Sequence, residues 1–553
     1  MNLRSPRQLE KCSIARDGEL RLIHSACMHC RVSPAIALLV FAPLSLVAQA
    51  THHHEHTRKG PSLAIQVNRL LAEPDIANSH WGISVTTLEG KQVFALNDGQ
   101  LFEPASNAKM FTTATAAALL PLSLTYTTNV VAEGAIDSAG ALHGDIAILG
   151  VGDPNISGRA LPYSAKTERP NPPLAALEAM ADQVAKSGVK QIDGDVIGDD
   201  TWFPAERYGS GWSWDDLEWL YGAPISALTV NDNAVFLNAD PGVQPGDKVT
   251  PQWDPAVSYY TLENSLTTAA RGTEAEFGID RAPGSHDVRV YGAIAIGGAG
   301  LHEGLALEDP ADFAARAFLG MLRERGIAVT GTAKPRHRDS VDAESLRKEQ
   351  EEPLPLTPST LQTVTTAPAG KRVLASHVSP PLMEDMTVTL KVSQNLHAEI
   401  TLRTLGKLLA RDGSLGQGTR VVRQFLISIG VRPQDFFFFD GSGLSNADLI
   451  TPRAATTLLA YASRQPWGAS WRSALPVAGV DGTLSNRFTN SPVKGKLDAK
   501  TGTLGEVRAL SGYMTTASGR TLAVSILVND HQPDSKAEGK AMDQLAEMIW
   551  KAE

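Results

Sequence analysis

Three short motifs in a fixed order constrain this chain more than its composition does. They are Ser106-Asn107-Ala108-Lys109, Ser393-Gln394-Asn395 and Lys500-Thr501-Gly502. Residues 110–392, 283 in all, separate the first motif from the second, so a fold that unites the motifs must bring distant segments together. The first motif has the form S-x-x-K, which also occurs at Ser187–Lys190, Ser345–Lys348 and Ser491–Lys494.

Sequence context selects Ser106 among these four serines. Pro104-Ala105-Ser106 opens a largely apolar stretch, Met110 to Leu120, that predicts a buried helix. Ser187 lies beside Gly188 at an expected helix end, Ser345 lies in a charged segment, and Ser491 precedes a proline. Residues three apart on a helix share a face, so the Ser106 Oγ and the Lys109 Nζ can meet.

A serine paired with a lysine can perform acyl transfer. The hydroxyl is a weak nucleophile until an adjacent base takes its proton. A lysine is such a base only if its ammonium is destabilised by burial or by a second cation. Lys500 is the candidate for that cation, Ser393 can relay a proton to a leaving amine, and Asn395 can hold a substrate amide.

The third motif predicts an edge strand that binds a substrate carboxylate. Lys500 supplies a cation, Thr501 supplies a hydroxyl, and Gly502 allows a close approach to the backbone. The backbone N–H groups of Ser106 and Thr503 are the expected oxyanion hole.

Composition and motif searches exclude other classes. The chain has 553 residues, enough for several domains, and its 42% hydrophobic and 20% charged residues are ordinary for a soluble globular protein. A net charge of −10 argues against a general nucleic-acid-binding protein. The sequence contains no H-E-x-x-H, G-x-S-x-G or P-loop motif, and we expect neither a metal nor a cofactor.

Residues 1–50 resemble a secretory signal peptide. Arg31 precedes the apolar run Pro34–Val47, and Ala48-Gln49-Ala50 supplies a cleavage site. A start at Met28 would give a signal of normal length, and we predict that translation begins there. The mature chain would then lack cysteine, because Cys12, Cys27 and Cys30 all precede the cleavage site.

The mature chain is expected to be exported without a transmembrane anchor, because the apolar run is too short to span a bilayer and no later segment approaches that length. The tract His52–His56 is interpreted as a solvated tail, although such tracts can bind metals.

The pattern of elements predicts an α/β (α+β) protein. We expect a first catalytic-domain part at residues 51–126, a mostly β insertion of one or two nested domains at 127–380, and a second part at 381–553. Predicted hairpins at residues 81–97 and 511–528 would form an antiparallel sheet flanked by helices. Helices are predicted at 383–410 and 534–550, and a surface loop or linker at 336–355.

Several further stretches carry a family resemblance. They are Ser379–Leu382, Asp440-Gly441-Ser442-Gly443-Leu444-Ser445, Thr451-Pro452, Leu475–Leu484 and Leu510–Tyr513. With the three motifs, they resemble the class C low-molecular-mass penicillin-binding proteins, the D-alanyl-D-alanine carboxypeptidase/endopeptidase family, over about residues 62–553. The resemblance implies a β-lactamase/transpeptidase-like domain, and the long insertion is typical of this family and not of β-lactamases.

The resemblance also implies roles for individual residues. Ser106 would be the acylated nucleophile and Lys109 its base; Ser393 and Asn395 would form the second motif. Lys500, Thr501, Gly502 and Thr503 would bind the substrate, and Asp200 and Phe203 would approach its diaminopimelate arm. Gln394 stands where β-lactamases have aspartate, and Asn446 stands where some relatives have arginine.

The implied function is a periplasmic serine peptidase that acts on peptidoglycan stem peptides and is trapped by β-lactam antibiotics. Two alternatives remain at this stage. A β-lactamase would use the same groups but deacylate quickly, and a non-catalytic wall-binding scaffold would form no penicillin adduct.

Overall fold

The structure, a computed structural model, describes residues 62–164, 169–340, 345–366 and 369–553. The predicted signal peptide, the predicted start at Met28 and the tract His52–His56 lie outside these residues. In the described ranges, no helix is both long enough and apolar enough to cross a membrane.

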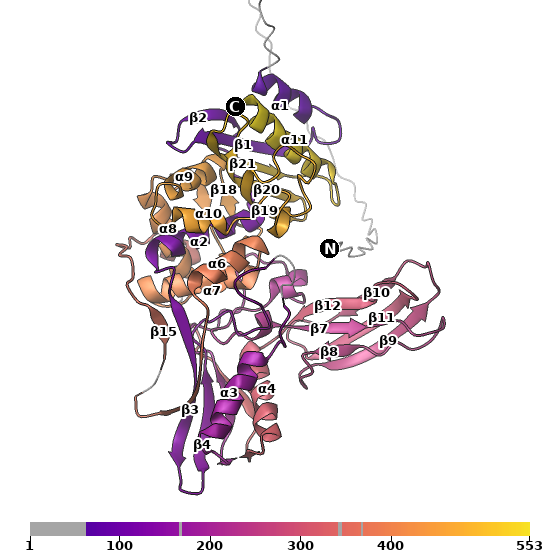
Figure 1. Cartoon of the computed structure of the whole chain (residues 1–553), viewed down its shortest axis with the longest axis vertical. Coiled ribbons are helices and arrows are strands. Elements are labelled where there is room, and N and C mark those ends of the chain that lie inside the picture. The colour runs from indigo at the N-terminus through magenta and orange to yellow at the C-terminus, as the bar shows by residue number, and fades with distance from the viewer. Residues whose placement is uncertain (1–61, 165–168, 341–344, 367–368) are drawn as a thin grey trace, which may run out of the picture. The chain divides into compact units, whose positions relative to one another are not determined.

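Strands from both ends of the described chain form one antiparallel sheet (Figure 1). Its strands are β1 (His80–Thr87), β2 (Gln92–Leu96), β19 (Leu497–Leu504), β20 (Val507–Thr515) and β21 (Thr521–Asn529). The strand order is β19-β20-β21-β1-β2, so β19 is an edge strand. The two predicted hairpins are confirmed, since β1 pairs with β2 and β20 pairs with β21.

Both faces of this sheet are covered, which explains the almost unbroken apolar sequence of β21. Val524 and Ile526 pack toward α1 (Leu63–Leu71) and α11 (Ala537–Ala552), whereas the alternate residues Ala523 and Leu527 pack into the helical core on the other face. Side chains alternate between the two faces of a strand, so a strand buried on both faces needs apolar residues at successive positions.

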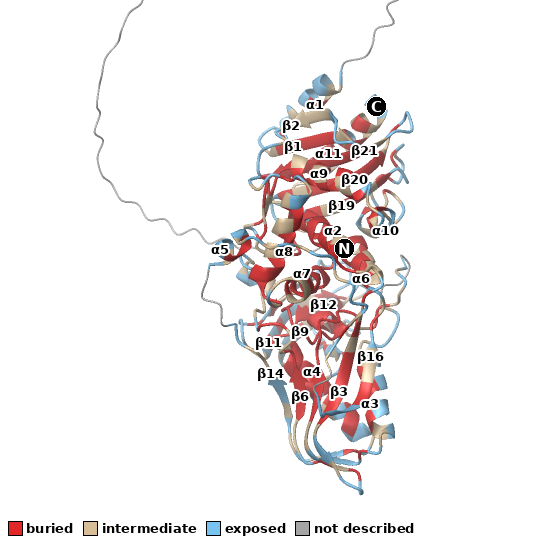
Figure 2. Ribbon diagram, turned by 90° about the vertical axis from the view of Figure 1, so that its left-hand side faces the viewer, coloured by how far each residue is buried: buried red, intermediate tan, exposed pale blue. Residues whose placement is uncertain are grey.

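The helical core surrounds α2, nearly all of whose residues are buried. Figure 2 shows the buried residues of α2, α6 and α7 in red beside the sheet. A helix enclosed on all sides needs apolar or small residues all round, and α2 has them. The elements of this part are α2 (Ala108–Leu119), α6 (Leu382–Lys391), α7 (Asn395–Leu409), α8 (Leu415–Ser428), β17 (Phe436–Phe437), β18 (Leu449–Ile450), α9 (Pro452–Ala462) and α10 (Gly468–Ser473).

The predicted helical stretch 383–410 is two helices and not one. Helix α6 ends at Lys391 and α7 begins at Asn395. Between them Ser393 has a φ of 65°, in the left-handed region where a helix cannot continue. The interruption places the second motif at the start of α7.

Strands dominate the long insertion, as predicted. In its described residues, β3, β4, β5, β6, β13, β14, β15 and β16 form an eight-stranded sheet, and the remaining strands form two three-stranded sheets, β10-β11-β9 and β12-β7-β8. The strands are β3 (Thr125–Ile136), β4 (Ala141–Leu149), β5 (Gln191–Ile192), β6 (Val196–Asp199), β7 (Ala234–Ala239), β8 (Gln252–Asp254), β9 (Thr261–Ala269), β10 (Glu276–Asp280), β11 (Asp287–Ala295), β12 (Leu301–Ala306), β13 (Ala328–Val329), β14 (Ala333–Arg336), β15 (Thr363–Thr365) and β16 (Arg372–Val378).

Two helices pack on the eight-stranded sheet, α3 (Ala175–Lys186) and α4 (Pro310–Glu324). The insertion also contains the short helix α5 (Leu346–Glu351). One-turn 3₁₀ helices in the chain lie at Ala105–Asn107, Trp214–Asp216, Leu220–Gly222, Asn231–Asn233 and Gly482–Leu484. Strand β3 pairs with β15 and β16, so the two ends of the insertion lie side by side.

The segment 336–355 is not simply the loop or linker that its charge predicted. Residues 346–351 form α5, which packs on α8 and buries Glu349 and Gln350. The Gln350 Nε2 donates to the Phe438 carbonyl at 2.7 Å and to the Thr419 Oγ1 at 3.0 Å. The charge of this segment predicted exposure to solvent, but Glu349 and Gln350 are buried because they find polar partners inside the protein.

A pair of glycine substitutions tests how tightly α4 packs on β6. A Cβ on Gly198 in β6 would lie 2.0 Å from the carbonyl oxygen of Ala311 in α4. A Cβ on Gly320, which also lies in α4, would meet nothing within 4 Å. We expect Gly198→Ala to destabilise the protein by about 1–3 kcal/mol. Gly320→Ala should instead stabilise it by about 0.5–1 kcal/mol through helix propensity. Urea unfolding midpoints measure both effects, and equal midpoints for the two variants would contradict this packing.

Candidate active site

Ser106 lies in a strained turn at the entrance to α2. It is the middle residue of the 3₁₀ turn Ala105–Asn107, which runs directly into the helix. Ala105 has a φ of 44°, an uncommon conformation for a residue with a side chain. The turn directs the Ser106 Oγ toward the Lys109 Nζ, which donates to it at 2.8 Å. The predicted pairing of these two residues is therefore present in the structure.

The ammonium group of Lys109 is buried among acceptors from three separate segments. Besides Ser106, it donates to the Asn395 Oδ1 at 2.6 Å and to the Ser442 carbonyl at 2.7 Å. Burial lowers the pKa of Lys109 to about 7, although nearby carboxylates, Asp440 first among them, oppose this shift. Lys109 is thus half neutral near pH 7, as a base for a serine hydroxyl must be.

Of the two predicted ways to destabilise the Lys109 ammonium, burial or the nearby Lys500 cation, burial is the main cause of its lowered pKa. Lys500 is itself fully buried, and burial, followed by the charge of Lys109, lowers its pKa well below the ordinary value.

The second motif faces both lysines. The Lys500 Nζ donates to the Ser393 Oγ at 2.8 Å, while Asn395 accepts from Lys109 through its Oδ1. The Asn395 Nδ2 donates to the carbonyl of Tyr221 at 2.8 Å, so a segment of the insertion reaches this motif. The left-handed backbone of Ser393 allows Ser393 and Asn395 to face the same site from two sides of a helix break.

The edge strand β19 supplies the third wall. Ala499 donates its backbone N–H outward to the Pro476 carbonyl at 2.8 Å, away from β20. Because N–H directions alternate along a strand, the N–H groups of Thr501 and Thr503 also face outward. This orientation suits the predicted oxyanion-hole donor at Thr503. The Thr501 Oγ1 lies 2.6 Å from the Thr483 Oγ1 at the same edge.

Packing requires a glycine at position 502, a requirement that the sequence alone does not show. A Cβ there would lie 2.7 Å from the Pro104 carbonyl oxygen and 3.1 Å from the Ala105 Cβ. Glycine therefore allows β19 to pack against the turn that carries Ser106, whereas the sequence had suggested only the approach of a substrate.

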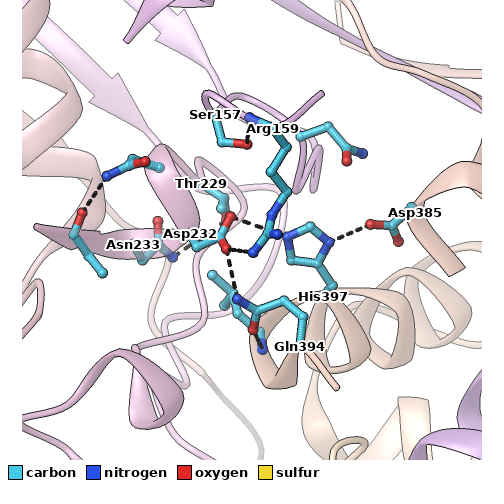
Figure 3. Close-up of polar contacts among 12 residues, drawn as sticks. Ser157, Arg159, Thr229, Asp232, Asn233, Asp385, Gln394 and His397 are labelled. Atoms are coloured by element: carbon cyan, nitrogen blue, oxygen red, sulfur yellow. Dashed lines mark hydrogen bonds and ion pairs between the residues drawn. The ribbon is translucent and has the colours of Figure 1, made fainter. Parts of the chain in front are cut away.

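A buried polar network holds the second motif from the insertion side. Figure 3 shows Asp232 surrounded by Arg159, Gln394 and His397. Asp232 forms ion pairs with Arg159 and Arg169, accepts from the Gln394 Nε2 at 2.7 Å, and contacts the His397 Nε2 at 3.3 Å. Burial would raise the pKa of Asp232, but the two guanidinium groups hold it well below the ordinary value.

The same network extends to α6 through His397. Its Nδ1 lies 2.6 Å from the Asp385 Oδ1. Burial alone would lower the pKa of His397, yet Asp385 and Asp232 raise it to about 9. His397 is therefore a cation between two carboxylates at neutral pH, and it fixes α6, α7 and the insertion to one another.

The carboxyl groups of Asp440 and Glu399 fix the conformation of the loop 441–445, which contacts Lys109. The sequence alone did not predict this role. The Asp440 carboxylate accepts from the backbone N–H groups of Gly443, Leu444 and Ser445 at 2.7–2.9 Å. Glu399 accepts from the N–H groups of Gly441 and Ser442 at 2.8 Å each. Together they direct the Ser442 carbonyl toward Lys109. The sequence of Asp440–Ser445 carries the family resemblance but does not indicate this role.

The prediction that Asp200 and Phe203 approach a substrate side chain is not supported. Asp200 is buried and bonded to the Ser226 Oγ at 2.9 Å and to the His337 Nδ1 at 2.9 Å. Phe203 is buried in a small apolar cluster with Leu396 and Ile400 on α7. Phe203 thus packs against α7, whereas Asp200 binds polar groups within the insertion. Asn446 donates to the Ser213 Oγ at 3.1 Å, a contact with the insertion.

The structure also separates Ser106 from the three decoy serines. Lys109 is fully buried, whereas the lysines three residues after the other serines, Lys190, Lys348 and Lys494, are all exposed. Ser187 and Ser345 lie at helix ends, and Ser491 lies in a turn. Among these four pairs, only Ser106 and Lys109 show the burial that lysine base chemistry requires.

Comparison with known proteins agrees with this geometry. Residues 63–362 and 357–549 match the D-Ala-D-Ala carboxypeptidase 3 (S13) family. The chain is 31% identical over 477 residues to the D-alanyl-D-alanine carboxypeptidase of Actinomadura sp. (strain R39), covering 84% of this chain and 80% of that protein. It is 26% identical to the D-alanyl-D-alanine carboxypeptidase DacB of Haemophilus influenzae, covering 82% of this chain and 86% of that protein.

A solved structure shows the same fold. The crystal structure of penicillin-binding protein 4 from Haemophilus influenzae matches with a TM-score of 0.69 at 24% identity, and the match covers 88% of this chain and 98% of that one. The predicted transpeptidase-like fold is confirmed. The chain belongs to the D-Ala-D-Ala carboxypeptidase 3 (S13) family, within the low-molecular-mass penicillin-binding proteins.

Proposed function

We propose that this protein is a penicillin-sensitive, serine-type D-Ala-D-Ala carboxypeptidase that uses Ser106 as its nucleophile. The observation that carries the proposal is the contact between the Ser106 Oγ and the Lys109 Nζ, a fully buried lysine whose pKa lies near 7. Family membership supplies the substrate class, peptides that end in D-Ala-D-Ala.

The reaction follows from the positions of the groups. The neutral Lys109 amine takes the Ser106 proton as the Oγ forms a bond to the carbonyl carbon of the penultimate D-alanine. The N–H groups of Ser106 and Thr503 stabilise the oxyanion. The C–N bond then breaks as Ser393 gives its hydroxyl proton to the leaving amine and takes a proton from the Lys500 ammonium, which donates to it. Water attacks the resulting ester and returns a proton to Lys500 through Ser393, while the Lys109 ammonium gives its proton to the departing Ser106 Oγ. The peptide leaves as a carboxylic acid, and all groups regain their starting protonation.

Three finer statements belong to the same proposal. The enzyme acts on peptidoglycan in the periplasm after removal of residues 1–50, which N-terminal sequencing of the exported protein tests. It also cleaves cross-linked peptides, in which a second stem peptide replaces D-alanine as the leaving amine. A β-lactam traps Ser106 as a stable ester; in support, the Haemophilus influenzae relative has been solved in complex with a β-lactam.

Release of D-alanine tests the proposal directly. The wild-type mature protein should release D-alanine from an uncross-linked pentapeptide ending in D-Ala-D-Ala. Ser106→Ala should lower the rate by roughly four orders of magnitude or more, because no other group can form the acyl-enzyme. The decoy variant Ser491→Ala should keep the rate within about twofold. An active Ser106→Ala protein would refute the assignment of the nucleophile.

The pKa of Lys109 predicts the pH dependence of acylation. Only the neutral amine can accept the serine proton, and that form predominates above pH 7. The acylation rate with a fluorescent penicillin should therefore rise with pH and level off above about pH 7, and at pH 5 it should be roughly 100-fold below the plateau.

Two lysine substitutions make this measurement specific. Lys109→Arg should abolish acylation at every pH, because the guanidinium keeps its proton. Lys494→Arg, at the decoy motif, should leave the profile unchanged. A rate that is constant between pH 5 and pH 8 would exclude Lys109 as the base.

A further inference from the structure

A basic hollow of about 260 Å³ adjoins the substrate-binding edge of β19. It lies between the end of β19, the start of β20 and the start of α11, and Gly502 and Thr503 form part of its wall. The other charged residues that line it are Arg487, Arg508, Lys536, Lys540 and Asp543. Nothing in the reaction described above uses these side chains.

The hollow carries an excess of positive charge. Its one lining carboxylate, Asp543, is bound by Arg487, whose Nε donates to the Asp543 Oδ1 at 3.1 Å. Arg508 donates one Nη2 hydrogen bond, to the Ser535 carbonyl at 2.8 Å. Lys536 and Lys540 are exposed, and neither forms an ion pair with any described residue. Such clustering is notable in a chain whose net charge is −10.

Geometry connects the hollow to the reacting groups. Thr503 and Arg508 are partners in the β19–β20 register, so their side chains lie on the same face of the sheet. The backbone N–H of Thr503 faces outward at the edge, where the oxyanion is expected. A substrate that passes along this edge therefore meets the hollow next to Thr503.

We propose that this basic hollow is a subsite for carboxylates of the leaving stem peptide when the substrate is cross-linked. This inference rests on the function proposed above and specifies the substrate class of that same site. In the carboxypeptidase reaction the leaving group is a single D-alanine, whose only carboxylate binds at Thr501 and Thr503. In a cross-linked substrate, the leaving amine belongs to a second peptide that carries further free carboxylates.

The basic hollow therefore affects the cleavage of cross-linked peptides and not the release of D-alanine, although Ser106 is the nucleophile in both reactions. Cations at a partly open site attract carboxylates through charge and hydrogen bonds, and salt weakens that attraction. Cleavage of cross-linked dimers should depend on Lys536 and Lys540 and should fall as ionic strength rises. Release of D-alanine from an uncross-linked pentapeptide should depend on neither.

The double variant Lys536→Gln/Lys540→Gln tests this inference in the full-length mature protein. Both side chains are exposed, so the substitutions should not disturb folding. The control, Lys91→Gln/Lys551→Gln, removes the same charge at two other exposed lysines. Kinetics are measured on a purified cross-linked muropeptide dimer and on an uncross-linked pentapeptide. A third substrate is a dimer in which the carboxylates of the leaving peptide are converted to amides, except the one next to the leaving amine.

For the acidic dimer, we expect the test variant to raise KM by roughly five- to tenfold with little change in kcat. The pentapeptide and the control variant should stay within about twofold of wild type. The amidated dimer should be cleaved equally by wild type and test variant. Unchanged dimer cleavage by the test variant, or an equal loss on dimer and pentapeptide, would overturn the inference. A wild-type protein that releases D-alanine but leaves dimers intact would also overturn it, whereas failure to release D-alanine would instead refute the proposed function.

Discussion

Burial of two lysine ammonium groups in one site is the constraint on which the rest of this structure depends. An ammonium group removed from water is costly unless acceptors surround it, and the cost shifts its pKa toward the neutral form. Lys109 finds acceptors in Ser106, Asn395 and the Ser442 carbonyl. Lys500 finds acceptors in Ser393 and the Thr501 carbonyl. These contacts join the helix start, the α6–α7 break, a loop and the sheet edge. The arrangement that satisfies the lysines is also the arrangement that activates the serine.

The insertion supports this site and is more than an appended domain. Asp232 receives Gln394, the central residue of the second motif, and Tyr221 offers its carbonyl to Asn395. The backbone at Asn231, Asp232 and Asn233 has φ values of 51–55°, a strained run held by the surrounding bonds. Gln394, the residue after the left-handed Ser393, thus contacts this run at the Asp232 carboxylate. The glutamine at position 394 fits this contact, because its amide can donate to a carboxylate and an aspartate side chain cannot when ionised.

The sequence predicted those parts of the site that depend on the pattern of neighbouring residues. Apolar context separates Ser106 from three decoys, and the predicted hairpins at both chain ends indicate one sheet. What the sequence could not show depends on tertiary contacts. The left-handed conformation of Ser393 interrupts the helical stretch predicted at 383–410, and no glycine or proline between Lys391 and Asn395 marks the break. Asp200 and Phe203 were placed at the site by resemblance, yet neighbours far away in the chain bury them.

The same limit applies to the acidic groups that support the catalytic residues. Asp440 and Glu399 act through backbone N–H groups of a loop, and nothing in their spacing shows which carbonyl they position. The charged sequence of α5 predicts a linker, whereas its burial depends on contacts with α8, which lies at least 60 residues further along the chain. The type of a polar residue does not show whether it is buried among hydrogen-bond partners or exposed to solvent, so a single sequence does not distinguish the two.

Peptide mapping of the penicillin adduct is the most direct test of the central claim that Ser106 is the nucleophile of this site. Trypsin should release Ser106 in the peptide Gln92–Lys109, which contains no other serine and no threonine. After reaction with excess penicillin and acid quenching, this peptide should gain the mass of one intact penicillin molecule. An adduct found instead on the peptide that contains Ser393, or on any other peptide, would contradict this account of the site.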